Sequence, residues 1–212
     1  SARTAFALAL LGVITMLAVV LTAESWLLAI DEQIYDRLDA GSHVDRYGPD
    51  WFHYFGRPQV VIPLALVIAA FTYRCRVLAL ASPLVIVLGG VLNLGLAALV
   101  GRVRPTEGAH VGRTDSFPSG HAIEVTLLLG LLPLALRVLT SNPVVGWLAR
   151  IGSTAVLAVM LIDGVRTGSH WPSDHLAGFL IALTLVIAVH ALARTPALHT
   201  QCRHHTLKDS EP

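Results

Sequence analysis

Long apolar stretches dominate this sequence and restrict what it can fold into. A helix that crosses a bilayer needs about 20 consecutive apolar residues. Six stretches reach or approach this length: Thr4–Leu28, Gln59–Tyr73, Val77–Val100, Ser119–Leu139, Trp147–Gly164 and Trp171–Leu192. The sequence therefore predicts an all-α fold, a polytopic membrane protein built as a six-transmembrane-helix bundle.

Composition and charge exclude most other classes of protein. Only 14% of the 212 residues are charged, against about 25% in an average globular domain. The mean hydropathy is +0.66, so neither an ordinary soluble domain nor a disordered chain is expected. A net charge of +1 gives no reason to expect a nucleic-acid partner, and two cysteines cannot form a disulfide scaffold.

We expect one membrane domain at residues 1–194, followed by a polar tail at residues 195–212. The first apolar stretch could also be a signal peptide. However, it carries a single early charge, Arg3, and no small-x-small cleavage motif near Ala23. Its length of about 25 residues also exceeds that of a typical signal-peptide core. A retained membrane anchor is therefore expected.

Basic residues indicate the orientation only weakly, because alternating spans divide the 15 lysines and arginines almost equally between the two sides. On one side the arginines lie among acidic residues and within polar motifs, so they are discounted as topological signals. The N-terminus and the tail are then expected on the cytoplasmic side of the plasma (inner) membrane. Both cysteines, Cys75 and Cys202, would face this reducing compartment as free thiols.

Polar residues near the membrane are concentrated in three segments at the ends of spans. Gly101–Pro105 follows the third span, Phe117–His121 leads into the fourth, and Arg166–Asp174 joins the fifth to the sixth. By alternation, all three emerge on the same face of the bundle, which is the extracytoplasmic face in the orientation above. Because ionisable groups are costly at this depth and usually functional, their convergence predicts a single site.

Two of these segments combine a histidine with the start of a helix. Pro118 and Pro172 suit the first turn of a helix. Each helix would therefore begin close to His121 or His170, with free backbone N–H groups that can bind an anion. His170 and Asp174 are four residues apart on one helix face, so the carboxylate can orient the imidazole or merely cap the helix.

An anion is the ligand that these residues favour. Ser119 and Gly120 would let a phosphate approach the backbone, and Arg104 could clamp its oxygens with a forked guanidinium. A metal site built from the two histidines and Asp174 is possible by residue type. The neighbouring Arg104 favours the anion instead, so no metal is expected.

The three segments resemble the signature of the type-2 phosphatidic acid phosphatase superfamily, integral-membrane lipid phosphatases related to vanadium haloperoxidases. Its motifs are Lys-x6-Arg-Pro, then Pro-Ser-Gly-His, then Ser-Arg-x5-His-x3-Asp. Arg104-Pro105 matches the end of the first motif, Pro118–His121 matches the second, and His170 with Asp174 matches the third. Order and spacing agree over about Val77–Leu192.

This resemblance implies a metal-independent phosphohydrolase that needs no cofactor. His170 would attack phosphorus to form a phosphohistidine, Asp174 would orient it, and His121 would protonate the leaving oxygen. The phosphoryl oxygens would be bound by Arg104, Ser119 and the backbone at Gly120.

Two motif positions differ from the pattern. Ala97 stands where the first-motif lysine is expected, and Asp163 and Gly164 replace the Ser-Arg pair of the third motif. Arg102 and Arg166 lie nearby and are candidates to substitute as phosphate ligands. For Arg166 to reach the phosphate, the fifth span would have to end near Asp163 or Gly164, which we expect, with Asp163 either steadying or simply neutralising Arg166.

Three other polar residues within spans have less specific interpretations. Glu124 lies one turn beyond His121 and could hold that histidine, line the substrate entrance or pair structurally with an arginine. Asn93 and His190 are more typical of hydrogen bonds between helices than of a site.

The expected function is hydrolysis of a phosphomonoester or pyrophosphate of a lipid in the cell envelope. Prenyl phosphates, prenyl-linked sugar phosphates and glycerophospholipid phosphates all fit. The expected partners are this lipid substrate and the bilayer, and the oligomeric state stays open. One alternative is a lipid phosphotransferase that uses the same phosphohistidine. Another, motivated by Ala97 and Gly164, is a catalytically silent lipid-phosphate binder or transporter.

Overall fold

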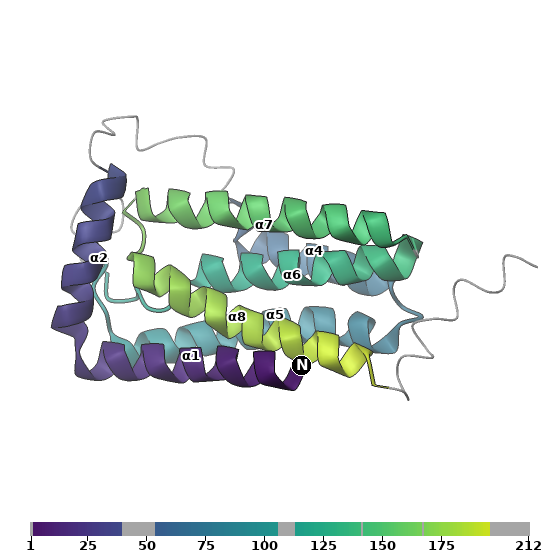
Figure 1. The fold of residues 1–212 in the computed structure, drawn as a ribbon, viewed down its shortest axis with the longest axis horizontal. Helices are drawn as coiled ribbons and strands as arrows, with labels where there is room; N and C mark the ends of the chain where they lie inside the picture. The colour runs from purple at the N-terminus through teal and green to yellow at the C-terminus, as the bar shows by residue number, and fades with distance from the viewer. Residues whose placement is uncertain (1, 40–53, 106–112, 141, 167, 196–212) are drawn as a thin grey trace, which may run out of the picture.

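The computed structural model describes residues 2–39, 54–105, 113–140, 142–166 and 168–195. Within these ranges, helices are the regular secondary structure and no strand is present (Figure 1). The helices are α1 (Ala2–Thr22), α2 (Glu24–Asp39), α4 (Pro58–Phe71), α5 (Arg76–Val100), α6 (Gly120–Thr140), α7 (Pro143–Arg166) and α8 (Pro172–Ala193). The predicted all-α class is confirmed.

Five of these helices, α1, α5, α6, α7 and α8, are long and apolar enough to cross a membrane. The helix α4 is also apolar but has only 14 residues, fewer than the roughly 20 that a bilayer core requires. The chain is thus a multi-pass membrane protein, but the predicted count of six spans is not confirmed.

The first apolar stretch differs from its prediction as a single span over Thr4–Leu28. α1 ends at Thr22, Ala23 is not helical, and a separate helix begins at Glu24. In Figure 1, α2 lies across the end of the bundle instead of continuing along it. The physical reason is the charge on α2, which includes Glu24, because charged side chains are costly inside the hydrocarbon.

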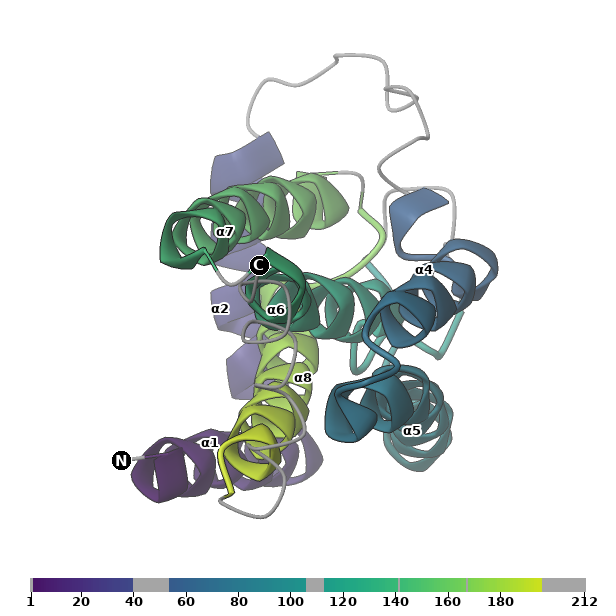
Figure 2. The same cartoon turned by 90° about the vertical axis from the view of Figure 1, so that its right-hand side faces the viewer.

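α6 is the central helix of the bundle. Seen end-on in Figure 2, it lies between α4, α7 and α8. Small residues permit close contact between the helices, as is common in membranes. A Cβ on Gly89 of α5 would lie 2.7 Å from Leu127 and 2.8 Å from Ile123, both on α6, and a Cβ on Gly178 of α8 would lie 2.6 Å from the Ser119 carbonyl. The contact of Gly178 with Ser119 packs α8 closely against the start of α6.

The outward faces of the bundle are apolar, as expected for helices surrounded by lipid. Large exposed side chains on these faces include Leu8, Leu80, Val91, Leu148 and Ile151.

Cys75 lies in the turn between α4 and α5, at the end of the bundle opposite α2 (Figure 1). It is buried and disulfide-bonded, so its prediction as a free thiol is wrong. The predictions for Cys202 and for the tail beyond Thr195 fall outside the described residues.

Candidate active site

The polar segments that follow α5, precede α6 and join α7 to α8 meet at the end of the bundle that α2 covers (Figure 1). A cavity of about 330 Å³ opens there. Of the residues proposed from the sequence, Arg104, Gly120, His121, Glu124 and His170 line it.

His170 is buried and its ring is held in one orientation. Its Nδ1 lies 2.8 Å from the backbone carbonyl of Ser116. A carbonyl can only accept a hydrogen bond, so Nδ1 carries the proton, and Nε2 of the neutral ring keeps its lone pair. His170 lines the cavity with this imidazole, which is the form a nucleophile requires.

Asp174 acts on His170 through other groups. Its Oδ2 lies 3.8 Å from His170 Nδ1, beyond hydrogen-bonding distance. The same oxygen accepts hydrogen bonds from the Ser116 hydroxyl at 2.5 Å and the Trp171 N–H at 2.9 Å. Asp174 therefore fixes the start of α8 and the position of Ser116, whose carbonyl in turn holds His170.

Arg102 is completely buried, and its partners are protein carboxylates. Nη1 donates to Asp174 at 2.6 Å, and Nη2 donates to Asp31 of α2 at 2.7 Å. Arg102 does not line the cavity. Its prediction as a phosphate ligand is therefore not supported by the geometry. Arg102 instead compensates the buried carboxylates of Asp174 and Asp31, which need a cation.

Arg104 lies beside the Nε2 edge of the His170 ring. Its Nη1 donates to the Ser169 carbonyl at 2.6 Å and lies 3.3 Å from His170 Nε2, while Nε donates to Asp115 at 2.8 Å. Partial burial acts to raise the pKa of Asp115, but hydrogen bonds and charges from Arg104 and Arg113 outweigh it and lower that pKa. The carboxylate thus stays ionised and keeps the guanidinium in place.

The start of α6 differs from its sequence-based interpretation at one residue. Ser119 is fully buried, and its hydroxyl accepts a hydrogen bond from the Ala122 N–H at 3.3 Å. It caps α6 and does not line the cavity, so its prediction as a phosphate ligand is not supported by the geometry. Gly120 and His121, the next two residues, do line the cavity.

The predicted end of the fifth span near Asp163 or Gly164 is wrong. α7 continues through Arg166, whose side chain is exposed and lines neither the 330 Å³ cavity nor the smaller one beside it. A continuous helix satisfies its own backbone groups, which lipid cannot do. Within the described residues, no ion pair joins Asp163 to Arg166.

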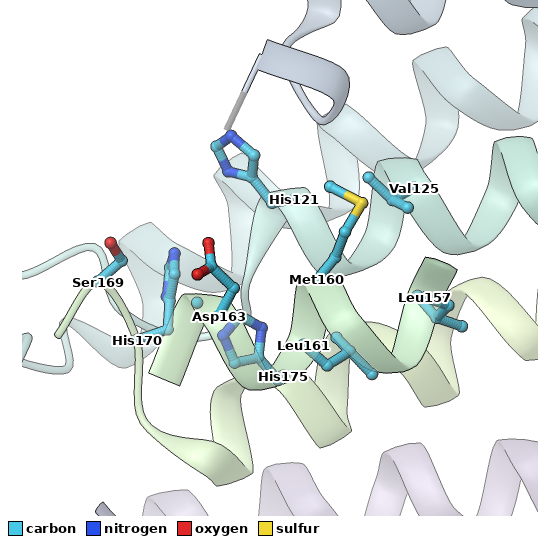
Figure 3. A pocket seen from close by; sticks show the side chains of 10 residues that line it. His121, Val125, Leu157, Met160, Leu161, Asp163, Ser169, His170 and His175 are labelled. Atoms are coloured by element: carbon cyan, nitrogen blue, oxygen red, sulfur yellow. The ribbon is translucent and has the colours of Figure 1, made fainter. Parts of the chain in front are cut away.

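A smaller cavity, of about 30 Å³, adjoins the main one (Figure 3). Its lining includes Asp163, His121, His170 and a histidine that the sequence analysis missed, His175. His175 is buried with its ring centroid 5.4 Å from that of His170. His175 could have been found from the sequence, because it directly follows Asp174 in an apolar helix, where an ionisable residue suggests function.

The remaining polar candidates separate into two kinds. His190 Nε2 of α8 lies 3.4 Å from the Gly130 carbonyl of α6, which confirms the predicted contact between helices. Asn93 and Glu124 instead line the main cavity. Among the described residues, no group of three or more His, Cys, Asp and Glu side chains is arranged to hold a metal ion.

These features define a multi-pass membrane protein with a cavity that brings Arg104 together with His121 and with His170, whose ring is held by the Ser116 carbonyl. The family model of the PAP2 superfamily matches residues 60–196. The chain therefore belongs to the PAP2 superfamily, which confirms the resemblance found in the sequence.

A solved structure supports the fold independently. The crystal structure of the first transmembrane PAP2 type phosphatidylglycerolphosphate phosphatase from Bacillus subtilis matches with a TM-score of 0.76 and 22% sequence identity. The match covers 88% of the present chain and 94% of that chain. No curated protein sequence gives a significant match.

Proposed function

We propose that this chain hydrolyses a phosphate ester of a membrane lipid through a phosphohistidine on His170. The observation that carries the proposal is the position of His170 Nε2. With the proton on Nδ1, this nitrogen is the acceptor of the ring, 3.3 Å from Arg104 Nη1 and in one cavity with His121. This arrangement provides a nucleophile, a cation for the phosphoryl oxygens and a second imidazole for proton transfer.

The proposed reaction has two steps. The Nε2 lone pair of His170 attacks phosphorus, the bond from phosphorus to the ester oxygen breaks, and His121 donates a proton to that oxygen. A water oxygen then attacks phosphorus and the phosphorus–nitrogen bond breaks, with His121 taking the proton of the water. Arg104 binds the negative charge that develops on the phosphoryl oxygens in both steps.

A lipid substrate is favoured by an apolar groove of about 680 Å³ between α4, α6 and α7. Val125 and Met160 line both this groove and the small cavity beside His121. An acyl or prenyl chain in the groove would therefore place an attached phosphate near the histidines.

The extracytoplasmic side is proposed for the site, but one observation opposes it. Cys75, at the other end of the bundle, is disulfide-bonded, and disulfides persist in oxidising compartments. The side of the membrane is therefore a separate part of the proposal with its own test, described in the Discussion.

The decisive experiment measures phosphate release by the detergent-purified protein from a panel of lipid phosphates, with and without an acceptor lipid. We expect release in water, unaffected by chelators and inhibited by vanadate, which resembles the transition state of the transfer. Phosphate transfer only to the acceptor would indicate the phosphotransferase. Binding without any turnover would indicate the silent binder.

Variants separate the two histidines. His170→Ala should abolish both turnover and the phosphorylated enzyme, whereas His121→Ala should slow turnover by about 10²–10⁴-fold. His190→Ala is the matched control, because this histidine bonds to Gly130 away from the cavity. Near-normal turnover by His170→Ala would overturn the mechanism.

A further inference from the structure

The backbone just before α4 lies directly against the ring of His121. A Cβ on Gly56 would lie 2.4 Å from Cδ2 of His121, 2.9 Å from its Cγ and 3.1 Å from its Cβ. Gly56 is buried, and both residues line the main cavity. The contact therefore lies inside the candidate site, and it is made by a residue that belongs to none of the three polar segments.

The turn that carries this glycine, at residues 54–57, is anchored on both sides. The Arg57 N–H donates to the Tyr54 carbonyl at 3.1 Å, and the guanidinium carbon of Arg57 lies 4.2 Å from the centre of the Tyr54 ring, a cation–π contact. Arg57 is also the N-cap of α4, which is held in the hydrophobic core by Val61. Because the turn is fixed in this way, its backbone cannot easily withdraw from His121.

The contact matters for the chemistry because His121 is the group proposed to protonate the leaving oxygen. A general acid has to lie within hydrogen-bonding distance of that oxygen, and a displacement of about 1 Å can cost on the order of 10²-fold in rate. With a Cβ at Gly56, the ring would have to move by about 1 Å, from 2.4 Å to an ordinary contact of 3.4 Å. Glycine is the residue that lets the backbone hold the ring this closely, because every other residue carries a Cβ.

We propose that Gly56 is a positioning residue for His121, which keeps the imidazole directed at the leaving oxygen of the substrate. The inference rests on the proposed function. It adds to that function a residue outside the part of the chain that the family model matches, residues 60–196. A strongly basic leaving oxygen requires the proton, whereas a weakly basic one departs without it. Displacing His121 should therefore slow the reaction of the first kind of substrate selectively.

The first test compares two phosphate monoesters that carry the same alkyl chain. One is an alkyl phosphate, and the other is a nitrophenyl phosphate bearing that chain, whose leaving oxygen is much less basic. The measured quantity is kcat/KM, which reports the transition state for loss of the leaving group. Gly56→Ala should lower it about 10²-fold for the alkyl phosphate and less than about threefold for the nitrophenyl phosphate. Equal losses for the two esters, or a loss below about threefold for the alkyl phosphate, would overturn the inference.

Gly130→Ala is the matched control for overpacking. Gly130 lies on the same helix as His121, and a Cβ there would lie 2.7 Å from Cγ2 of the buried Val186. Gly130 lines neither the main cavity nor the smaller one beside it. The variant should therefore change kcat/KM by the same factor for both esters. Selectivity as large as that of Gly56→Ala would show that overpacking alone produces the effect, and would overturn the inference.

A second variant decides the inference if Gly56→Ala does not fold. Tyr54→Leu removes the cation–π contact that braces the turn, adds no atom beside His121, and changes an exposed side chain. It should lower the ratio of kcat/KM for the alkyl phosphate to that for the nitrophenyl phosphate by about two- to fivefold, the worth of such a contact. An unchanged ratio would overturn the inference in that case.

A double variant tests whether the effect passes through the histidine. Adding Gly56→Ala to His121→Ala should cost little further activity on the alkyl phosphate, because the ring that the new methyl group displaces is absent. A further loss of about 10²-fold would show that Gly56 acts through another group, and would overturn the assignment.

A failure of the proposed function gives a different result from a failure of this inference. If the wild type hydrolyses neither ester, hydrolysis is refuted and vanadate binding decides the inference. Since vanadate resembles the transition state, the wild type and Gly130→Ala should bind it about tenfold more tightly than Gly56→Ala does. Equal affinities, or no binding by the wild type, would overturn the inference as well. If the wild type hydrolyses both esters and Gly56→Ala slows both equally, only the inference fails.

Discussion

At the scale of single residues, His170, the proposed nucleophile, depends on a chain of buried contacts that begins at Asp174. We expect Asp174→Asn to lower the free energy of unfolding by about 3 kcal/mol, because Arg102 loses a buried partner. It should also reduce formation of the phosphorylated enzyme by at least tenfold, since the single oxygen of asparagine cannot accept hydrogen bonds from Arg102 on one side and from Ser116 and Trp171 on the other.

Asp31→Asn is the matched control for this prediction. Asp31 pairs with the same arginine, with its Oδ2 2.7 Å from Nη2 of Arg102, but bonds to neither Ser116 nor Trp171. Thermal unfolding in detergent should show a similar loss of stability, while the phosphorylated enzyme forms nearly as fast as in the wild type. Equal kinetic losses in the two variants would contradict a specific role of Asp174 in positioning His170.

Two of the three arginines proposed from the sequence should differ strongly in their effect on turnover. Arg104→Lys should reduce turnover on the order of 10²-fold, because a single ammonium cannot reproduce the forked contacts to Asp115 and Ser169. Arg166→Ala should cost less than about threefold, since Arg166 is exposed and outside the cavity. Rates of phosphate release measure both, and a large loss in Arg166→Ala would show that this side chain reaches the substrate.

At the scale of helices, the site depends on the close contact between α7 and α8. A Cβ on Gly164 would lie 2.5 Å from Nε2 of the buried His175. Gly164→Ala should therefore destabilise the protein by about 1–3 kcal/mol through overpacking, and adding His175→Ala should recover much of that loss. Gly152→Ala on the same helix, where nothing lies within 4 Å, should be neutral or stabilising. Thermal unfolding distinguishes these variants.

At the scale of the whole molecule, the orientation in the membrane is testable with cysteine labelling. In a protein without its native cysteines, Thr114→Cys reports on the site end and Asn142→Cys on the connection between α6 and α7. Both positions are exposed. We expect a membrane-impermeant maleimide to label only Thr114→Cys in right-side-out vesicles. The reverse pattern would place the site in the cytoplasm, as the Cys75 disulfide favours.

The class of the protein was determined by the sequence alone, and so was its family. An apolar run of membrane length predicts a helix independently of its neighbouring helices. Lipid offers no hydrogen-bond partners, so the backbone groups of the run must bond to one another. The motif residues His121, His170 and Arg104 could be found because their spacing relative to helix starts is local. The end of the first span could not be found in this way. α1 ends at Thr22, just before Glu24, because burying the charge of Glu24 in the hydrocarbon is too costly.

Only the tertiary structure decided what most of the charged groups do. Arg102 is a buried partner of Asp31 and Asp174, 71 and 72 residues away in the sequence, and no local pattern encodes that pairing. Likewise, His170 is held by the carbonyl of Ser116, which is 54 residues distant. The sequence determines which ionisable groups lie near the membrane. Which of them are neutralised inside the protein and which face the cavity depends on distant helices, because burying a charge is tolerable only where the fold supplies its partner.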